Sequence, residues 1–268
     1  LRDEVQHRSQ LPIYLAMRYG SPSISSQLAL IQQENSELTD LLVIPLYPQY
    51  AMSTTLTAEN AIRKAAQSLD CEFSIRVLPP FYQDSRYLTN LVDHMKPYTD
   101  APFDHLLFSF HGLPERHLRK TDSTNEHCLK VSNCCNSPSE AHQYCYKHQC
   151  EFVARHCASK LQIPSDKWSV SYQSRLGNDP WIKPYTDTII SDFPRTGVQS
   201  LLVVCPAFVS DCLETLEEIE MTAKESFVAA GGQTFRYIPC LNTQSDWCDT
   251  IEQWIQGFDT QQLVTEAL

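Results

Sequence analysis

The sequence predicts an α/β protein in which parallel β-sheets are flanked by helices. Short apolar runs, which are typical of buried strands, alternate along the chain with stretches of helical length. Several of these runs end at Pro or at a polar loop. A chain of 268 residues is also long enough to bury a full core. Because strand–helix alternation favours βαβ units with right-handed crossovers, we expect two similar halves that face each other across a cleft.

The first half contains expected strands that are each followed by a helix. Residues 1–10 are typical of the end of a helix, and the polar, Pro-containing stretch 97–105 marks a domain boundary. The strands are expected at 11–20, 41–50 and 71–82, with the following helices ending near 38, 69 and 98.

The second half repeats this alternation and adds a cysteine-rich insertion. Its strands are expected at 104–110, 166–174, 200–210 and 233–242. We therefore expect an N-terminal domain over 1–99, a C-terminal domain over 100–245 with an insertion at 121–150, and a C-terminal helix over 246–268.

Composition excludes several classes of function. The chain has seven glycines and contains no G-x-G-x-x-G or P-loop motif, which argues against a hydride-transfer enzyme or an NTPase. A net charge of −11 argues against general binding of nucleic acid. No apolar run of membrane-spanning length and no signal peptide is visible, so we expect no transmembrane segment, while peripheral membrane contact stays open. The sequence does not indicate an oligomeric state.

The cysteines indicate a reducing compartment. There are eleven of them, an odd number, and they are clustered rather than spread along the chain. Secreted proteins of this cysteine content usually form disulfides, but an odd count without a signal peptide favours free thiols. We therefore expect a cytoplasmic protein in which some cysteines bind metal.

The stretch LLFSFHGLP, residues 106–114, predicts a buried strand that ends at His111. Ligands of open parallel sheets bind just beyond the carboxyl ends of the strands, so His111 is a candidate for the functional site. The alternative interpretation is a polar residue that simply closes a strand.

A second stretch, residues 200–220, predicts a strand followed by an acidic helix that starts near Asp211. Asp211, Glu214 and Glu218 are three and four residues apart, which places them on one face of a helix. In the alternative interpretation Asp211 is the N-cap and Glu214 completes a capping box, which requires no function. A third stretch, residues 172–187, is a loop of aromatic and cationic residues at the end of a strand, as in many ligand sites.

These stretches together resemble the motifs of the ferrochelatase family, which inserts Fe²⁺ into a porphyrin to make haem. The motifs are SFHGLPER, YQSRLGNDPWIKPYTD, CPAFVSDCLETLEEIE and YIPCLN, with AMRYGSPS and IPLYPQYAMST in the first half. They follow the order of the family over nearly the whole chain and are most similar to the bacterial type that acts on protoporphyrin IX. The resemblance implies two Rossmann-like domains with the macrocycle in the cleft between them.

The resemblance also implies roles for individual residues. The metal-site histidine of the family falls on His111 and its metal-site glutamate on Glu214. The segments that line its porphyrin cleft include Arg18, Tyr19, Tyr47 and Gln49.

The chemistry of metal insertion suits these residue types. A neutral imidazole accepts a proton or binds the metal, and a carboxylate supplies oxygen to Fe²⁺. We expect His111 to take the first porphyrin proton and Glu214, backed by Glu218, to deliver the metal; the reverse assignment fits equally well. Lys and Arg side chains of residues 175–183 are expected to meet the porphyrin propionates.

The chain departs from the family pattern at two places. It lacks the N-terminal portion of the family, so we expect a truncated chain whose first sheet lacks a strand. It also carries five cysteines within residues 128–150, spaced C-x5-C-C-x9-C-x4-C. Some ferrochelatases carry a [2Fe–2S] cluster, and this segment resembles theirs.

We expect a [2Fe–2S] cluster held by four of these thiolates. The expected ligands are Cys128, Cys135, Cys145 and Cys150, with Cys134 as the alternative to Cys135. Zinc, or free or disulfide-bonded cysteines, are the alternative interpretations, although the spacing matches no standard zinc module.

The expected function is thus a cytoplasmic ferrochelatase that completes haem synthesis. Two alternatives stay open on the sequence: a chelatase for coproporphyrin or for another metal, and a tetrapyrrole- or iron–sulfur-binding protein without turnover.

Overall fold

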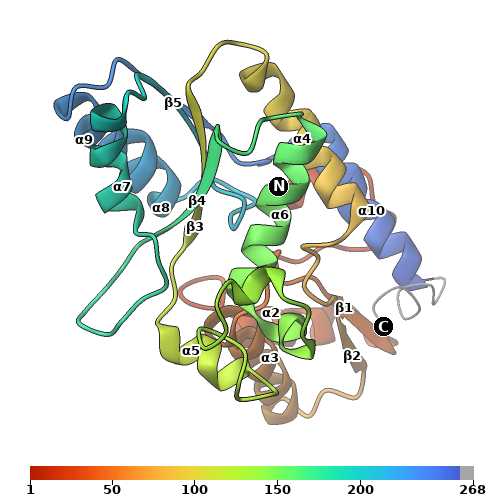
Figure 1. Ribbon diagram of the computed structural model, residues 1–268. Coiled ribbons are helices and arrows are strands. Elements are labelled where there is room, and N and C mark those ends of the chain that lie inside the picture. Colours follow the sequence, from red (N-terminus) through yellow and green to blue (C-terminus); the bar gives the residue numbers. More distant parts are fainter. Residues whose placement is uncertain (260–268) are drawn as a thin grey trace. The chain divides into compact units, whose positions relative to one another are not determined.

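The computed structural model describes residues 1–259, which form two compact units (Figure 1). The first unit comprises residues 1–46, 52–81 and 243–259, and the second comprises 47–51 and 82–242. Both are α/β units with parallel strands, which confirms the predicted fold class.

The first unit contains a two-stranded parallel sheet and the helices around it. Strand β1 (Asp40–Val43) pairs with β2 (Ser74–Val77). Leu28, Ala65, Ala66 and Phe73 form the buried core of this unit. Its helices are α1 (Arg2–Gln6), α2 (Ile24–Glu34), α3 (Thr57–Ser68) and α10 (Ser245–Asp259), with a π-helical turn at Met52–Leu56. The part of the expected C-terminal helix at 260–268 lies outside the described residues.

The strand expected at 11–20 is not present in this unit. Within the described residues, this segment makes only an isolated bridge between Met17 and Ser23. A strand requires a hydrogen-bonded neighbour, and β1 and β2 pair only with each other. As a result Leu11, Leu15 and Met17 are 43–47% exposed rather than buried.

The second unit contains a four-stranded, fully parallel sheet in the order β4-β3-β5-β6. Every residue of β3 except His111 is buried, as expected for a central strand that is covered on both faces. The strands are β3 (His105–His111), β4 (Trp168–Gln173), β5 (Ser200–Val204) and β6 (Thr234–Ile238).

Helices cover both faces of this sheet (Figure 1). Two of them, α4 (Ser85–Thr99) and α6 (Tyr146–Lys160), pack together on one face. The other face carries α7 (Thr186–Asp192), α8 (Leu213–Thr215), a π-helix (Leu216–Ala223) and α9 (Lys224–Ala229). Helix α5 (Glu115–Thr121) follows β3, and short 3₁₀ turns lie at Cys134–Asn136, Glu140–Tyr144 and Phe193–Thr196.

The register of the sheet decides which residues meet at its carboxyl edge. His111, the last residue of β3, lies opposite Gln173, the last residue of β4. Because ligands of parallel sheets bind at this edge, the candidate site is built here.

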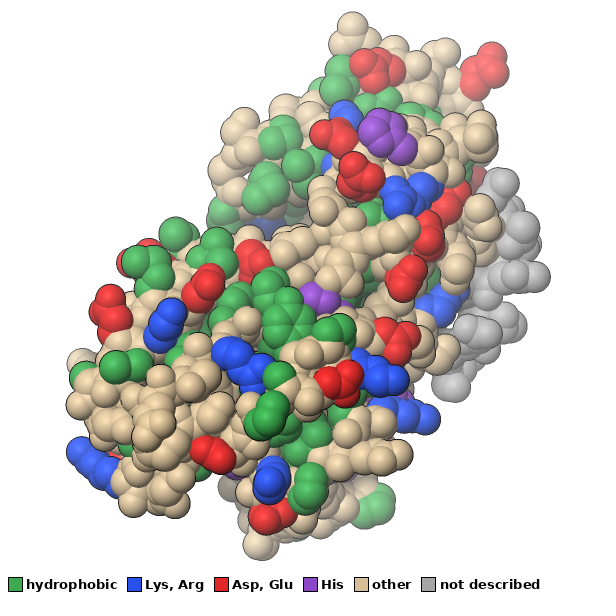
Figure 2. Space-filling view, turned by 90° about the horizontal axis from the view of Figure 1, so that it is seen from above, with side chains coloured by type: hydrophobic (Ala, Val, Ile, Leu, Met, Phe, Trp, Pro, Cys, Tyr) green, Lys and Arg blue, Asp and Glu red, His purple; other side chains and the backbone are tan. Residues whose placement is uncertain are grey.

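Two properties of the surface bear on partners. Among the helices within residues 1–259, none has the length and apolar character needed to cross a bilayer. On the face seen in Figure 2, acidic and basic side chains are interspersed. That face therefore presents no extended basic patch of the kind that binds a nucleic-acid backbone.

Candidate active site and cysteine-rich segment

His111 presents one ring nitrogen as a free acceptor. Its Nδ1 lies 2.7 Å from the carbonyl oxygen of Gly112. A carbonyl oxygen only accepts hydrogen bonds, so Nδ1 carries the proton of the neutral ring and Nε2 keeps its lone pair. The half-buried ring is flanked by Trp181 and Phe208, each with its centroid 6.4 Å away. The imidazole is therefore oriented to bind a proton or a metal through Nε2.

The backbone that follows His111 packs tightly against Gln173 and Trp181. The Gly112 N–H donates to the carbonyl oxygen of Gln173 at 2.8 Å. A Cβ atom at Gly112 would lie 2.9 Å from that same oxygen and 3.0 Å from the ring of Trp181. Only glycine allows the ends of the two strands to approach this closely, and the position of His111 depends on that approach.

A buried polar network lies beneath the histidine. Ser109 donates to the Gln173 side-chain oxygen at 2.7 Å and lies 3.0 Å from Thr186, which is 2.7 Å from Ser171. All four residues are at most 2% exposed. Their side chains satisfy one another's polar groups, as buried polar groups require.

Gln173 connects this network to the acidic helix. Its oxygen is occupied by Ser109, so its amide nitrogen faces the helix, where it donates to the backbone oxygen of Glu214 at 2.5 Å. The same nitrogen lies 3.4 Å from the carboxylate of Glu218. Gln173 thus lies opposite His111 in the sheet and contacts the backbone of Glu214 and the carboxylate of Glu218. The sequence interpretation named only the loop that starts here; polar residues at every second position of an apolar strand were the signal for Ser171 and Gln173.

The start of the acidic helix differs from the expected capping box. The N-cap is Cys212, and its partner at the third position is Thr215, whose hydroxyl accepts from the Cys212 N–H at 2.9 Å. The capping interpretation of Asp211 and Glu214 is therefore wrong. Asp211 instead accepts hydrogen bonds from Tyr237 and Asn242, each at 2.7 Å. The Glu214 carboxylate is consequently not used in a capping box.

The helix then continues as a π-helix rather than the α-helix that the sequence favours. Leu216–Ala223 has the wider winding produced by hydrogen bonds to the fifth residue along. Glu218 lies within it and accepts hydrogen bonds from the backbone N–H of Ser174 at 2.6 Å and from its hydroxyl at 2.5 Å. Ser174 adopts a left-handed φ of 62°. These contacts hold the Glu218 carboxylate in one orientation beside Gln173.

The residues expected to line the porphyrin site lie in both units. In the second unit, Gln49 is 2% exposed, with its amide nitrogen 3.4 Å from the Pro206 oxygen, and Tyr47 is half-buried in the same loop. In the first unit, the Arg18 guanidinium lies over the ring of Tyr19, 4.5 Å from its centroid, and Tyr19 is 73% exposed.

The cationic side chains of residues 175–183 lie along an aromatic ring. Arg175 lies over the ring of Tyr185, 4.4 Å from its centroid, and Lys183 lies 5.7 Å from the same centroid. Arg175 also lies 3.5 Å from the carboxylate of Asp187.

The cysteine-rich segment gathers buried thiols. Cys128, Cys134, Cys135, Cys145 and Cys150 are all at most 8% exposed. The Cys145 thiol lies close to the thiols of Cys128 and Cys135, and Cys134 is adjacent to Cys135. Cys150 is completely buried beside Tyr146. All eleven cysteines are free thiols.

The three histidines of the segment support its backbone. His127 Nε2 and His142 Nε2 both approach the Cys134 carbonyl oxygen, at 2.8 and 2.9 Å, and His148 Nδ1 approaches the Cys135 oxygen at 2.8 Å. Because these oxygens only accept, the three ring nitrogens donate. His142 and His148 are stacked, with centroids 3.6 Å apart. The imidazoles therefore hold the turn that carries Cys134 and Cys135.

Asp122 fixes the start of the segment. Its buried carboxylate accepts from the backbone N–H groups of Thr124, His127 and Cys128 at 2.8–3.0 Å, and from the Thr124 hydroxyl at 2.6 Å. Burial alone would raise the pKa of Asp122, but these donors stabilise the charged form and lower its pKa to about 2.

Within residues 1–259, no three His, Cys, Asp or Glu side chains are arranged around one point as ligands of a single ion.

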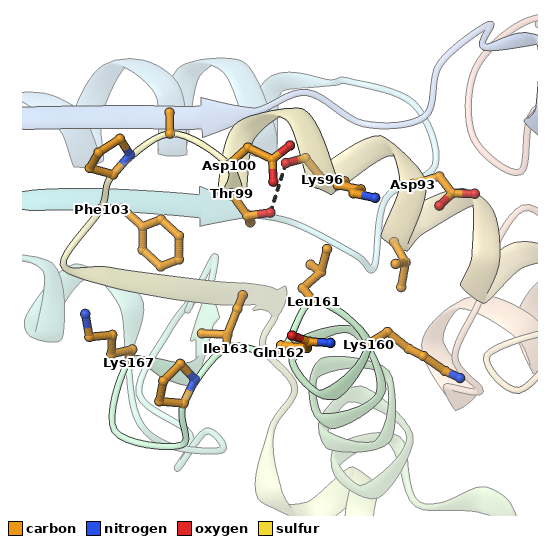
Figure 3. Close-up of a pocket in the computed structure, with 14 residues that line it drawn as sticks. Asp93, Lys96, Thr99, Asp100, Phe103, Lys160, Leu161, Gln162, Ile163 and Lys167 are labelled. Carbon is orange, nitrogen blue, oxygen red and sulfur yellow. Dashed lines mark hydrogen bonds between the residues drawn. The ribbon is translucent and has the colours of Figure 1, made fainter.

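A pocket of about 730 Å³ lies away from this site, at the opposite ends of β3 and β4 (Figure 3). Lys96 and Lys160, which line it, belong to the last turns of α4 and α6, where basic side chains complement exposed carbonyl groups. Figure 3 shows Phe103 and Ile163 between these lysines and Lys167. Lys96 and Lys160 are explained by the helix ends, and we assign no ligand here.

Solved structures share the fold of this chain. The chain is similar in fold to SirB from Bacillus subtilis with Fe³⁺, with a TM-score of 0.62, 11% identity, and coverage of 95% of this chain and 85% of that one. It is also similar to DR2241 from Deinococcus radiodurans, described as structurally similar to chelatases, with a TM-score of 0.51, 10% identity, and coverage of 93% and 48%.

Sequence comparison identifies the family. The ferrochelatase family profile matches residues 1–257. The chain is 50% identical over 244 residues to the ferrochelatase of Ectopseudomonas mendocina, covering 90% of this chain and 70% of that protein. It is 46% identical over 248 residues to that of Stutzerimonas stutzeri, covering 92% and 72%. The chain therefore belongs to the ferrochelatase family, as its motifs indicate.

The Asp122 contacts predict a local loss of stability in D122N. The amide of Asn cannot accept as a carboxylate does, so we expect the protein to lose about 1–3 kcal/mol of stability and the amides of residues 124–130 to exchange faster at pH 7. In the wild type, the stabilisation is present above the ordinary carboxyl pKa and is lost as the pH falls towards 2. Hydrogen exchange measures both effects. D179N, at the exposed Arg116–Asp179 ion pair, is the control; equal protection in both variants would contradict the role of Asp122.

Proposed function

We propose that His111, Glu214 and Glu218 form the iron-insertion site of this enzyme. As a ferrochelatase, it inserts Fe²⁺ into protoporphyrin IX to give protohaem, with release of two porphyrin N–H protons. The observation that carries the assignment is the Gln173 side chain, which links the strand end at His111 to the helix of Glu214 and Glu218.

The geometry supports a division of labour between base and metal ligand. His111 Nε2 is unprotonated in the neutral ring, so it can accept a pyrrole proton. The Glu214 carboxylate, which is not used in capping, supplies oxygen to Fe²⁺ and replaces water that the ion must lose. Glu218, oriented by Ser174, passes the proton outwards. The reverse roles for His111 and Glu214 use the same atoms.

We further propose porphyrin contacts for residues in each unit. In the second unit, Tyr47 and Gln49 belong to a loop whose buried amide is anchored on the Pro206 oxygen. In the first unit, Tyr19 is largely exposed and its ring is backed by Arg18. Arg175 and Lys183 supply positive charge for the propionates, because charge-assisted hydrogen bonds to carboxylates are strong.

We also propose that Cys128, Cys135, Cys145 and Cys150 hold a [2Fe–2S] cluster. Two observations support this donor set: the four thiols are buried, and Cys145, the N-cap of α6, lies close to Cys128 and Cys135. Each iron of such a cluster binds two cysteines, so three ligands around one ion are not required, as they are for zinc. Cys134 stays the alternative to Cys135. The cluster supplies one-electron redox capacity.

The proposed cellular setting follows from the thiols. Eleven free cysteines, several of them in mutual contact, persist as thiols or as metal ligands only in a reducing environment. We therefore propose that the enzyme works in the cytoplasm.

The His111 assignment predicts a selective loss of turnover. In H111A, removal of the base lowers kcat by about 100-fold or more, because general-base catalysis contributes about 10²–10⁴. Porphyrin affinity, measured by fluorescence quenching, stays within about threefold because the proton transfer to His111 stabilises the transition state and not the bound porphyrin. E214Q also lowers kcat, whereas E217Q, at an exposed neighbouring position, does not. Normal turnover by a folded H111A protein would refute the assignment.

The cluster assignment predicts an effect of Lys147 on its reduction potential. Lys147 Nζ lies 3.9 Å from Cys135 Sγ and is paired with Glu151. Because this positive charge favours the reduced, more negative cluster, K147M lowers the reduction potential measured by anaerobic titration of the visible spectrum. Lys130, paired with Glu126 and 49% exposed, provides the control variant K130M. A wild-type protein without cluster absorbance contradicts the cofactor, and identical potentials contradict the role of Lys147.

A further inference from the structure

The short segment between Cys145 and Cys150 makes direct contact with the candidate active site. The Tyr146 hydroxyl donates to the backbone oxygen of His111 at 2.8 Å. Tyr146 directly follows Cys145, the N-cap of α6, and lies close to the Cys150 thiol. Tyr146 is therefore a neighbour of two proposed cluster ligands and also holds the backbone of the residue proposed to accept the porphyrin proton.

Tyr146 makes this connection in a dry environment. Its side chain is 7% exposed, so bulk water has little access to the hydroxyl that donates to His111. A buried carbonyl that loses its donor cannot turn to bulk water without a change in packing. Movement of Tyr146 is therefore transmitted to the His111 backbone.

A second residue of the segment holds the loop that carries Tyr47 and Gln49. Gln149 is fully buried, and its side-chain oxygen accepts the N–H of Tyr50 at 2.6 Å. Its amide nitrogen donates to the Gln143 oxygen at 2.9 Å, within the cysteine-rich segment. Gln149 precedes Cys150 directly, as Tyr146 follows Cys145.

We propose that Tyr146 and Gln149 are positioning residues that couple occupancy of the cysteine site to the geometry of His111 and of loop 47–51. The proposal rests on the iron-insertion site and the cluster proposed above. With Cys145 and Cys150 held by iron, the first turn of α6 is fixed and both hydrogen bonds form. When the ligands are released, that turn loses its anchors, and the catalytic histidine and the loop lose their supports together.

The two contacts predict different kinetic effects. Tyr146 acts on the proton acceptor, so Y146F, which removes only the hydroxyl, lowers kcat about tenfold and leaves the KM for porphyrin unchanged. Gln149 acts on the substrate loop, so Q149L raises the KM for porphyrin by several-fold with a smaller effect on kcat. Q149E keeps the oxygen that accepts from Tyr50 but loses the donor to the Gln143 oxygen, so it restores only part of the affinity. Y14F, which removes a hydroxyl bonded to Glu34 in the first unit, keeps wild-type kinetics.

The coupling itself is tested by combining Y146F with removal of the cluster. Wild type and Y146F are purified anaerobically, and half of each sample is freed of iron with a chelator and a reductant. Cluster content is read from visible absorbance, kcat from haem formation, and the porphyrin Kd from tryptophan quenching without iron. We expect cluster removal to lower the wild-type kcat to the level of Y146F, with little further loss in Y146F, since both changes break one connection. We also expect removal to weaken porphyrin binding in both proteins.

Each contrary result is distinguishable. A cluster-free wild type that keeps full kcat and Kd overturns the coupling. Cluster-bearing Y146F with wild-type kcat overturns the positioning role of Tyr146. If Y146F and removal of the cluster lower kcat additively, they act independently, and the proposal that both act through Tyr146 is wrong. A wild-type protein that never shows cluster absorbance overturns the cofactor proposal on which the inference rests, and the spectrum reveals this before any kinetic measurement.

Discussion

The site depends on how one buried amide is satisfied. The Gln173 oxygen is occupied by Ser109, so its nitrogen is committed to the helix of Glu214 and Glu218. In a dry interior, an unpaired amide costs a substantial part of the stability of a domain. Strand register, serine network and acidic helix therefore form one consistent arrangement. A shift of β4 by one residue would turn Gln173 to the other face and separate the histidine from the carboxylates.

Parts of this arrangement were predictable from sequence, and the physical reasons differ from part to part. The strand that ends at His111 is strongly apolar and ends at Gly112 and Pro114, so both its type and its end were predictable. The π-helix was not, because acidic residues three and four apart fit an α-helix equally well. The capping box was misassigned because Asp is a stronger N-cap than Cys, and packing of Asp211 with Tyr237 and Asn242 overrides that preference. At 11–20, hydrophobic character predicts a strand, but within the described part of the chain no strand pairs with it.

The cysteine-rich segment was also only partly predictable from the sequence. Its thiol count indicates metal chemistry, and so does its clustering. Whether nearby histidines are ligands depends on what their ring nitrogens face, and three of them face carbonyl oxygens. Asp122 is equally inconspicuous in sequence, since one acidic residue before a loop is common. Its role follows from three backbone N–H groups that converge on it, which only the folded chain can bring together.

The hydrogen bond from Tyr146 to the His111 carbonyl also bears on how such a segment can be exchanged between proteins. A chelatase without this insertion has to satisfy the corresponding carbonyl in another way, with a different side chain or with water. Grafting residues 122–150 alone into such a scaffold would transfer the thiols and leave two competing groups at the carbonyl. Because residues 122–150 already include Tyr146 in the first turn of α6, a transplant of this segment should also remove the group that Tyr146 displaces. The insertion is then part of the structure that supports the His111 backbone, and not only an addition to the surface.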